Sequence, residues 1–273
     1  MTWPNVAYSQ IAGVGTTIID AHAHLGPGLR NHGEGSCEFS AITAQELVAA
    51  LDRAGIHKAI IFAPLYEGGE FIDPDYRRGN LAIYEAVRQA PERLIGYGRV
   101  CPNLQNDAIR EWRRCIDEYR MQGLMLHPDW ESFTPNNKRL MWPLAELCAE
   151  HGLPITFHSG YYPKCQPLLF LPLAEAFPKV PMFLKHLGYH YWRDAIIVAR
   201  HADNVYLETA GNTTSGEIMA AVREAGAAKV VFGSDLPYIV PEVVMAKIRG
   251  LPASDRDKSL ILGETVAKLH GLM

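Results

Sequence analysis

Several features that assign proteins to common classes are missing from this 273-residue sequence. Its five cysteines are widely spaced and form no Cys-X-X-Cys pair, which argues against a disulfide framework and against a thiolate zinc site. No apolar run approaches the roughly 20 residues of a membrane-spanning helix. The net charge is only -4 and no Lys/Arg cluster occurs, so we expect neither a nucleic acid nor a membrane as partner. A small-molecule substrate is the expected partner.

A secretory signal is also missing, because Met1-Thr2-Trp3-Pro4 does not begin a basic segment followed by an apolar one. Together with the unpaired cysteines, this predicts a cytoplasmic protein. The hydrophobic fraction of 48% is ordinary for a globular chain. Because barrels of about 250 residues are commonly one unit, we expect a single domain over residues 1–273.

Short apolar runs rich in β-branched residues alternate with longer amphipathic segments along the chain. We predict strands at residues 16–21, 58–63, 94–100, 123–127, 154–158, 180–186, 204–208 and 229–233. We predict helices at residues 47–54, 78–89, 106–121, 137–150, 168–177, 194–201 and 216–225, with two more that begin near Pro241 and Asp255. A capping box formed by Thr43 and Glu46 precedes the first helix, and Gly55 follows it.

This alternation predicts an α/β fold, a parallel sheet closed into a (β/α)8 TIM barrel. The rival is an open, doubly wound sheet, which places a Gly-rich phosphate turn after an early strand. The first strand is instead followed by His22-Ala-His-Leu-Gly-Pro-Gly, which does not have the G-X-G-X-X-G spacing. We therefore favour the barrel.

The His22-Ala23-His24 stretch is the first candidate for chemistry. In an extended segment, positions 22 and 24 project to the same face. Two imidazoles supply half of a metal site, because a catalytic zinc usually has three protein ligands and an open position. Taken alone, the pair can equally be an accident on an exposed strand.

Polar side chains close most of the other predicted strands, and five of the 11 histidines fall at strand ends. These positions are His22, His24, His127, His158, His186, Glu208 and, after the last strand, Ser234-Asp235. A lone His before a turn is more often a structural residue than a ligand. A barrel, however, brings all of its carboxyl-terminal strand ends to one mouth, so the joint pattern predicts a shared site.

Six motifs spread over nearly the whole chain carry a family resemblance. They are Asp20-Ala-His22-Ala-His24, Gly123-Leu-Met-Leu-His127-Pro, Leu153-Pro-Ile-Thr-Phe-His158-Ser-Gly160, Leu184-Lys-His186-Leu-Gly188, Phe232-Gly-Ser-Asp235-Leu-Pro237 and Gly263-Glu-Thr-Val-Ala-Lys-Leu-His-Gly. The sequence resembles the amidohydrolase superfamily, in the amidohydrolase-related branch of metal-dependent TIM-barrel hydrolases. This branch includes aminocarboxymuconate-semialdehyde decarboxylase and related non-oxidative decarboxylases.

The resemblance implies that His22, His24, His158 and Asp235 are metal ligands, and that His186 is a catalytic or additional metal-facing residue. Two positions depart from the pattern. Met125 stands where many relatives carry Lys, which affects substrate contacts, and Thr265 replaces a common Asn, which we expect to affect only local packing.

Three neutral imidazoles and one carboxylate suit one divalent ion, with zinc first and manganese or iron as alternatives. We expect one ion rather than two. Binuclear members of the superfamily bridge their ions with a carboxylated Lys or a Glu, and the thioether of Met125 cannot bridge. Lys185 is expected on the opposite strand face from His186 if both lie in the strand, so we discount it as a bridge.

The leading hypothesis is a hydrolase that cleaves an ester, lactone or amide bond with metal-activated water. Asp235 would accept or relay the proton of that water, and His186 would stabilise the oxyanion or protonate the leaving group. Asp20 has two equal interpretations, an orienting partner of a ligand or a buried structural carboxylate.

The alternative is a metal-dependent decarboxylase, which needs cations to bind a carboxylate. Arg30 and Arg99 are the candidates, although Arg30 can simply be solvated and Arg99 structurally paired. The chain is short beside typical decarboxylases of this branch, which modestly favours the hydrolase. A third class, an inactive barrel that only binds a ligand, would lack a metal ligand, and none is missing.

Substrate specificity is expected in the loops after the strands. His127, Trp130 and Tyr161 are candidate substrate-binding residues, and the aromatic ones either line a pocket for a ring-shaped substrate or pack over the barrel rim. Nothing around Cys37 indicates a nucleophile. A homodimer is compatible with the fold.

Overall fold

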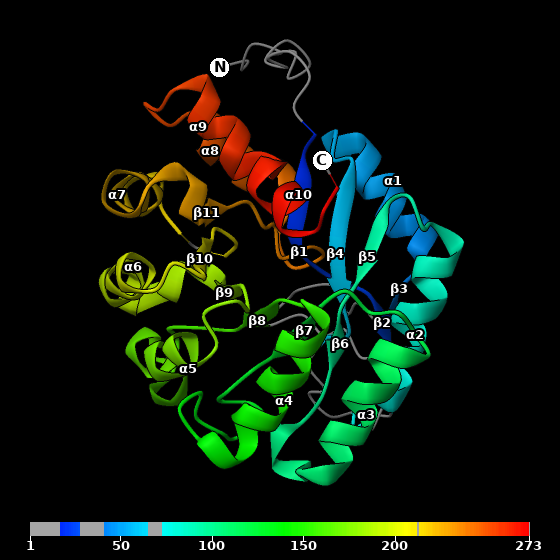
Figure 1. The fold of residues 1–273 in the computed structure, drawn as a ribbon. Coiled ribbons are helices and arrows are strands. Elements are labelled where there is room, and N and C mark those ends of the chain that lie inside the picture. Colours follow the sequence, from blue (N-terminus) through cyan, green and yellow to red (C-terminus); the bar gives the residue numbers. More distant parts are fainter. Residues whose placement is uncertain (1–16, 28–40, 65–72, 212, 273) are drawn as a thin grey trace.

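The computed structural model describes residues 17–27, 41–64, 73–211 and 213–272, so Arg30 and Cys37 lie outside the described residues. Within the described part, parallel strands form the central sheet of the fold (Figure 1). They are β1 (Ile19–His24), β4 (Lys58–Phe62), β5 (Leu94–Gly96), β6 (Gly98–Arg99), β7 (Leu124–Leu126), β8 (Ile155–Phe157), β9 (Met182–Leu184), β10 (Val205–Glu208) and β11 (Val230–Val231). Strand β2 (Gly26–Pro27) follows β1 along the chain and forms a short antiparallel pair with β3 (Ala41–Ile42).

The parallel strands form two hydrogen-bonded groups, one of β1, β4 and β5 and the other of β6 to β11. The two groups adjoin each other at both edges. Tyr97, between β5 and β6, joins them, because β5 pairs with β4 and β6 pairs with β7. At the other edge the amide of Ala21 donates to the carbonyl of Phe232 over 2.9 Å, and the amide of His24 donates to the carbonyl of Leu236 over 2.7 Å. The sheet therefore closes on itself, and the predicted (β/α)8 barrel is confirmed.

Helices cover the outside of the barrel (Figure 1). The α-helices are α1 (Ala44–Ala54), α2 (Arg77–Gln89), α3 (Asn106–Asp117), α4 (Lys138–His151), α5 (Leu171–Ala176), α6 (Trp192–His201), α7 (Ser215–Ala225), α8 (Pro241–Arg249), α9 (Asp255–Ser259) and α10 (Thr265–Leu269). Shorter helical turns occupy Pro102–Leu104, Pro163–Cys165, Pro167–Phe170, Lys185–Tyr191, Ala227–Lys229 and Leu260–Glu264. The predicted capping box of Thr43 and Glu46 begins α1, and Gly55 ends it in the left-handed conformation.

Several predicted boundaries differ in the structure. The first strand, predicted at residues 16–21, runs from Ile19 to His24 and so includes both histidines. The helix predicted at residues 168–177 is α5 from Leu171 to Ala176, and the last strand, predicted at 229–233, is limited to Val230–Val231. The strand predicted at residues 94–100 is broken at Tyr97, where the chain changes its hydrogen-bonding partner from β4 to β7. The strand predicted to reach His186 ends at Leu184, because His186, Leu187 and Gly188 adopt left-handed backbone angles (φ 57°, 51° and 78°). The helix predicted to reach residue 121 ends at Asp117.

Apolar side chains fill two separate layers. One lies between the strands and the helices, and the other fills the amino-terminal part of the barrel interior. The interior cluster consists of Ile19, Ala21, Ile60, Phe62, Ile95, Tyr97, Met125, Phe183, Val231, Val266 and Ala267. These side chains make the barrel floor a packed core rather than a channel. Any site must therefore lie at the opposite, carboxyl-terminal end of the strands.

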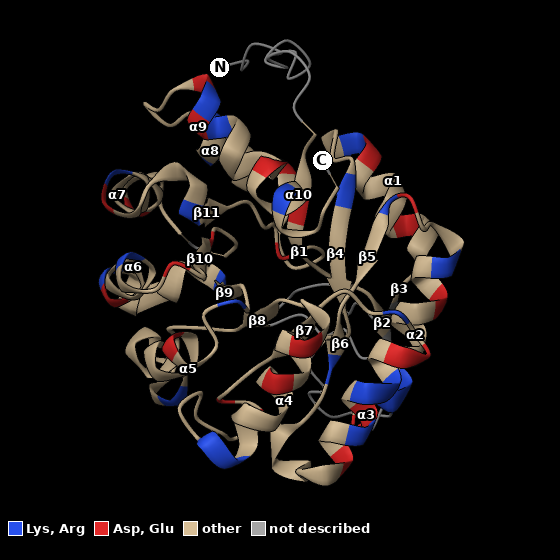
Figure 2. Ribbon diagram, viewed as in Figure 1, with Lys and Arg blue, Asp and Glu red and all other residues tan. Residues whose placement is uncertain are grey.

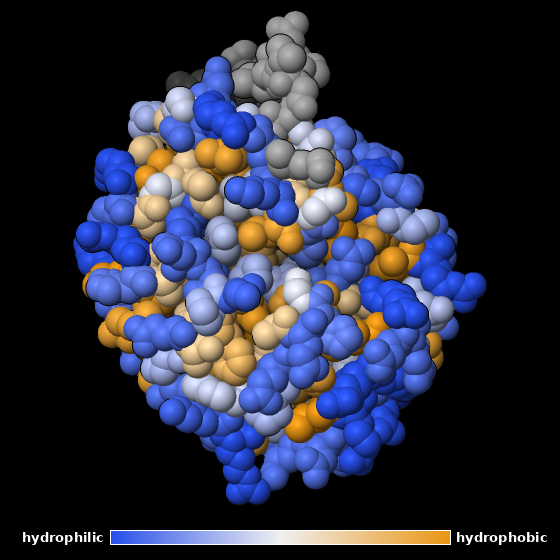
Figure 3. Space-filling model, viewed as in Figure 1, coloured by the Kyte–Doolittle hydropathy of each residue, from blue (hydrophilic) through white to orange (hydrophobic). Residues whose placement is uncertain are grey.

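Charged side chains lie mainly on the outer helices (Figure 2), and the face drawn in Figure 3 is largely hydrophilic with scattered apolar side chains. No helix among the described residues combines the length and the apolar character that crossing a membrane requires.

Candidate active site

Three predicted metal ligands converge at the mouth of the barrel. The Nε2 atoms of His22 and His24 lie 3.2 Å apart, and Oδ1 of Asp235 lies 2.9 Å from the first and 3.1 Å from the second. His22 and His24 point to one side from β1, as the alternation predicts, and Asp235 follows β11, which neighbours β1 in the closed barrel. Two separate parts of the sequence thus supply one cluster of donor atoms.

The spacing of these atoms fits a divalent ion. Ligands at about 2.1 Å from an ion lie about 3.0 Å from their neighbours in an octahedral site and about 3.4 Å in a tetrahedral one. The observed separations of 2.9 to 3.2 Å bracket the octahedral value. Imidazole nitrogens and a carboxylate are also donors that zinc, manganese and iron share. The residues present therefore fit the metal that the sequence predicts.

Opposing effects set the protonation of this cluster. Burial alone raises the pKa of Asp235, but the neighbouring His22 and hydrogen bonds with His22 and His24 hold that pKa well below its usual range. Burial lowers the pKa of His24 to about 3, against the opposing hydrogen bond with Asp235. Burial and Lys185 lower the pKa of His22, yet Asp235 and Glu208 outweigh them and raise it. The carboxylate is thus ionised and attracts positive charge, as a cation site requires.

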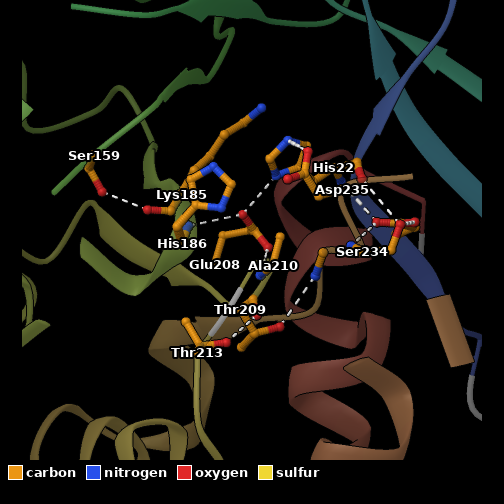
Figure 4. A network of polar contacts seen from close by, with 12 residues as sticks. His22, Ser159, Lys185, His186, Glu208, Thr209, Ala210, Thr213, Ser234 and Asp235 are labelled. Carbon is orange, nitrogen blue, oxygen red and sulfur yellow. Dashed lines mark hydrogen bonds and ion pairs between the residues drawn. The ribbon is translucent and has the colours of Figure 1, made fainter. Parts of the chain in front are cut away.

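Glu208, at the end of β10, supports this cluster from behind. Its Oε2 lies 3.0 Å from Nδ1 of His22 and accepts the backbone N–H of His186 over 3.3 Å, while its Oε1 accepts the N–H of Ala210. Figure 4 shows the carboxylate between the two histidines. Glu208 is predicted at a strand end, but the sequence indicates no role for it. Its position beside His22 follows from the closure of the barrel, which brings the ends of β1 and β10 to the same mouth.

Asp20 is a structural carboxylate rather than a partner of an imidazole ring. Its Oδ1 accepts the backbone N–H groups of His22 (3.0 Å) and Ser234 (2.9 Å), and the Ser234 hydroxyl donates to Oδ2. Burial raises the pKa of Asp20 to about 6. A register shift in β1 between Asp20 and Ala23 accompanies this arrangement. Asp20 thus ties β1 to the segment that carries Asp235.

The other strand-end histidines continue the cluster across the mouth. The rings of His22 and His186 have centroids 5.1 Å apart, His186 and His158 4.7 Å, and His158 stacks on His127 at 3.9 Å. One ligand atom each from His22, His186 and Asp235 lie within 4.8 Å of one another. Burial lowers the pKa of His158 to about 3, and Lys185 contributes in the same direction. All five predicted histidines therefore share one site.

Arg99 is buried and structurally paired. Its Nε donates to Oε1 of Glu131 over 2.9 Å and its Nη1 donates to the carbonyl of Ala63 over 3.1 Å, while its guanidinium lies over the ring of Tyr76. Its Nη2 has no hydrogen-bond partner among the described residues. Glu131, which the sequence did not single out, also accepts the N–H of His127 over 2.8 Å. The described residues thus hold Arg99 through Nε and Nη1 and leave its Nη2 amino group without a hydrogen bond.

Lys185 corrects one of the sequence-based predictions. Its side chain is fully buried, and its Nζ lies 3.4 Å from the centre of the Phe62 ring inside the barrel. Strand β9 ends at Leu184, so the side chains of Lys185 and His186 do not alternate and both can face the interior. Burial lowers the pKa of Lys185 well below its usual range.

The aromatic candidates lie at the rim. Trp130 and Tyr161 are 46% and 49% exposed, and Tyr161 contacts the rings of Tyr162 and Tyr189 edge-on. The backbone N–H of Trp130 donates to Nδ1 of His127 over 3.2 Å. This hydrogen bond leaves the proton of a neutral His127 on Nε2. The rim therefore combines exposed aromatic surface with a buried imidazole donor.

Comparisons with known proteins agree with this geometry. Residues 19–272 match the family described as Amidohydrolase. A curated relative, the gamma-resorcylate decarboxylase of Polaromonas sp. (strain JS666 / ATCC BAA-500), is 22% identical over 217 residues, which cover 59% of this chain and 65% of that protein. The match thus spans slightly less than two thirds of the length of that relative.

Two solved structures share the fold. The 5-carboxyvanillate decarboxylase LigW from Sphingomonas paucimobilis has a TM-score of 0.73 at 15% identity, over 94% of this chain and 99% of that one. The dihydroxybenzoic acid decarboxylase from Polaromonas sp. JS666, solved with bound manganese and the inhibitor 2-nitroresorcinol, has a TM-score of 0.70 at 17% identity, over 94% and 97%. At these identities the likeness establishes the fold alone.

Proposed function

Because the chain belongs to the amidohydrolase family, we propose that it is a metal-dependent, non-oxidative decarboxylase of a small carboxylated aromatic compound. The observation that carries the proposal is the convergence of His22, His24 and Asp235 donor atoms within 3.2 Å at the barrel mouth. The sequence alone favoured hydrolysis. The decarboxylase names of the relatives support the alternative reaction instead.

His22, His24, His158 and Asp235 are the proposed ligands of one divalent ion. Such an ion, when bound, supplies Lewis-acid chemistry that polarises oxygen atoms of the substrate. The sequence favoured zinc. We propose manganese, because imidazole and carboxylate donors bind it and a structural relative was solved with that ion.

Proton transfer is assigned to Asp235 and His186. Loss of CO2 leaves an electron pair on the ring carbon, which must take up a proton. The ligand atoms of these two residues and of His22 lie within 4.8 Å of one another, so either side chain can reach an atom bound at the centre of the mouth. Asp235, which is ionised, first accepts a proton from the phenol hydroxyl of the substrate or from water, and then delivers that proton to the ring carbon as the C–C bond to CO2 breaks.

Substrate recognition is assigned to the far side of the mouth. Arg99 offers its Nη2 and His127 its Nε2–H as donors, and two such N–H groups suit the oxygen atoms of a carboxylate or a phenol. Tyr161 and Trp130 provide aromatic surface at the rim for a ring. A hydroxylated benzoate combines both features.

A two-arm assay tests the proposal. Purified protein loaded in turn with Mn2+, Zn2+ or Fe2+ is incubated with a panel of hydroxylated benzoates, and CO2 release is measured. The same preparations are followed in a pH-stat with lactones, esters and amides. We expect metal-dependent CO2 release from at least one benzoate, highest with Mn2+. Acid production in the second arm without CO2 release in the first would instead support the hydrolase.

A further inference from the structure

Glu208 contacts both histidine segments at the mouth without itself belonging to the donor cluster. Its carboxylate accepts from the side chain of His22, from the backbone of His186 and from the backbone of Ala210 (Figure 4). We infer that Glu208 is a positioning residue, which fixes the His22 ring for metal binding and holds the turn that carries His186. The inference rests on the proposed function only in requiring that the site binds a metal.

The contact with His22 determines which ring nitrogen is available. A carboxylate can only accept a hydrogen bond, so Nδ1 of His22 carries the proton and donates it over 3.0 Å. The lone pair of a neutral ring is then on Nε2, the atom that faces His24 and Asp235. A partner of this kind also fixes the rotation of the ring and raises its basicity as a ligand.

The space for the Glu208 carboxylate is built into β11 and the residues that follow it. A Cβ atom at Gly233 would overlap Oε1 of Glu208 and lie 2.8 Å from Cβ of His22. Only glycine fits between the two side chains at this point. Glu208 is 1% exposed, so water cannot replace its contacts without a change of structure.

The hydrogen bond from the backbone of His186 to Glu208 stabilises an unfavourable backbone conformation. His186 and the next residue, Leu187, have left-handed angles of φ 57° and 51°, which side-chain-bearing residues rarely adopt. Their conformation places the His186 ring against His22 on one side and stacked on Tyr189, 4.4 Å away, on the other. The bond from the His186 N–H to Glu208 satisfies a buried donor that a regular strand would have paired.

Only a carboxylate can make all three contacts. Two N–H donors share Oε2 and a third reaches Oε1, so both oxygens must accept. A glutamine in the same place turns one oxygen into an NH2 group, which then faces an N–H donor. The side chain must rotate or one contact must be lost, although size and shape are nearly unchanged.

Metal affinity tests the role directly, and it needs no knowledge of the substrate. Binding of Mn2+ and of Zn2+ is measured by competition with a chelating dye for the wild type, Glu208→Gln, Glu208→Asp and Glu111→Gln. Glu111 is the matched control, because it is equally buried but lies on α3, where it accepts from Asn80 and pairs with Arg77. We expect Glu208→Gln to weaken binding by about 10- to 100-fold, and Glu111→Gln to leave it unchanged.

A spectroscopic readout separates positioning from mere stabilisation of the fold. In imidazole 15N–1H spectra of the Zn2+-loaded protein, His22 of the wild type is expected to show a slowly exchanging Nδ1–H that is held by Glu208, and Glu208→Gln is expected to lose that signal. If Glu208→Gln does not fold, Glu208→Asp decides: it keeps the charge but shortens the reach, and we expect an intermediate loss of affinity.

The outcomes distinguish the two proposals. A folded Glu208 variant that binds both metals as tightly as the wild type overturns the positioning role and leaves the proposed function standing. A wild type that binds neither ion overturns the proposed function, and this inference fails with it.

Discussion

The two ends of the barrel interior are equally buried but are held together differently. At the floor, apolar side chains such as Ile60, Ile95 and Phe183 pack against one another. At the mouth, the same strands end in imidazoles, carboxylates and a guanidinium, most of them less than 8% exposed. Burial alone therefore does not distinguish the functional end. The functional end is distinguished by the partners of its side chains, which are hydrogen-bonding and charged groups instead of apolar ones.

Three buried carboxylates organise the mouth. Asp20 accepts from His22 and Ser234, Glu131 accepts from Arg99, Tyr76 and His127, and Glu208 accepts from His22, His186 and Ala210. Each satisfies several donors at once, as a buried charge requires. The floor is thus stabilised by packing and the mouth by hydrogen bonds. Substitutions at the two ends are expected to have different consequences.

The largest effect is expected at the centre of the mouth. Asp235→Asn keeps the shape of the side chain but removes the charge that attracts a cation. Metal affinity and CO2 release should therefore both fall by at least about 100-fold, which exceeds the usual loss for a residue that only hydrogen-bonds to a ligand. The metal-free variant should also unfold at a lower temperature, because it loses the ion pair with His22, so metal binding is measured well below that temperature. Retained Mn2+ binding in a dye-competition titration would contradict the assignment of Asp235 as a ligand.

Arg99→Met tests whether paired charges also stabilise the mouth. The substitution leaves Glu131 buried without its cation, and breaking such a pair costs about 3–5 kcal/mol. Denaturant unfolding should report this loss in free energy of unfolding. The double variant Arg99→Met, Glu131→Gln should recover part of it, because no uncompensated charge remains. If the single and double variants are equally stable, the unpaired charge of Glu131 is not the cause of the lost stability.

Gly123→Ala perturbs the floor instead. A Cβ atom at this position would overlap the ring of Tyr97, which is fully buried in the interior cluster. Overpacking of this kind costs about 1–3 kcal/mol, so the unfolding midpoint should fall. Metal affinity of the folded variant should stay at the wild-type value. A Gly123→Ala protein with weakened Mn2+ binding would show that the two ends are not independent.

A smaller effect is expected from pH at the floor. Burial lowers the pKa of His270 from 6.5 to about 4, and its Nε2 lies 2.9 Å from the hydroxyl of Tyr97. Between these values the unfolded chain binds a proton that the folded protein does not, so the free energy of unfolding falls as pH drops through this window. Below about pH 4 this group adds nothing further. Urea unfolding of the wild type and of His270→Gln at pH 7 and at pH 5 measures this change in the free energy of unfolding. Between pH 7 and pH 5 the variant should lose less stability than the wild type.

Local patterns explain why much of this architecture was predictable. Short apolar runs rich in β-branched residues identified the strands, and the barrel rule then identified which end of each strand to inspect. His22, His24 and Asp235 could be predicted to meet because each closes a strand and β1 and β11 are neighbours in a closed barrel.

Contacts between distant residues explain what the sequence did not reveal. The left-handed turn at His186 depends on a hydrogen bond to Glu208, 22 residues away, and the state of His22 depends on the same carboxylate 186 residues away. Arg99 found its partner in Glu131 within an irregular segment that has no periodic pattern. Lys185 was assigned to the wrong face because the end of a strand cannot be read from alternation alone.

The most direct measurement of the central claim is anomalous diffraction at the manganese edge from crystals grown with Mn2+. One peak is predicted at the barrel mouth, roughly 2.0–2.2 Å from Nε2 of His22, Nε2 of His24, an imidazole nitrogen of His158 and the carboxylate of Asp235. A peak bound elsewhere, or none at this position in Mn2+-saturated crystals, would contradict the account.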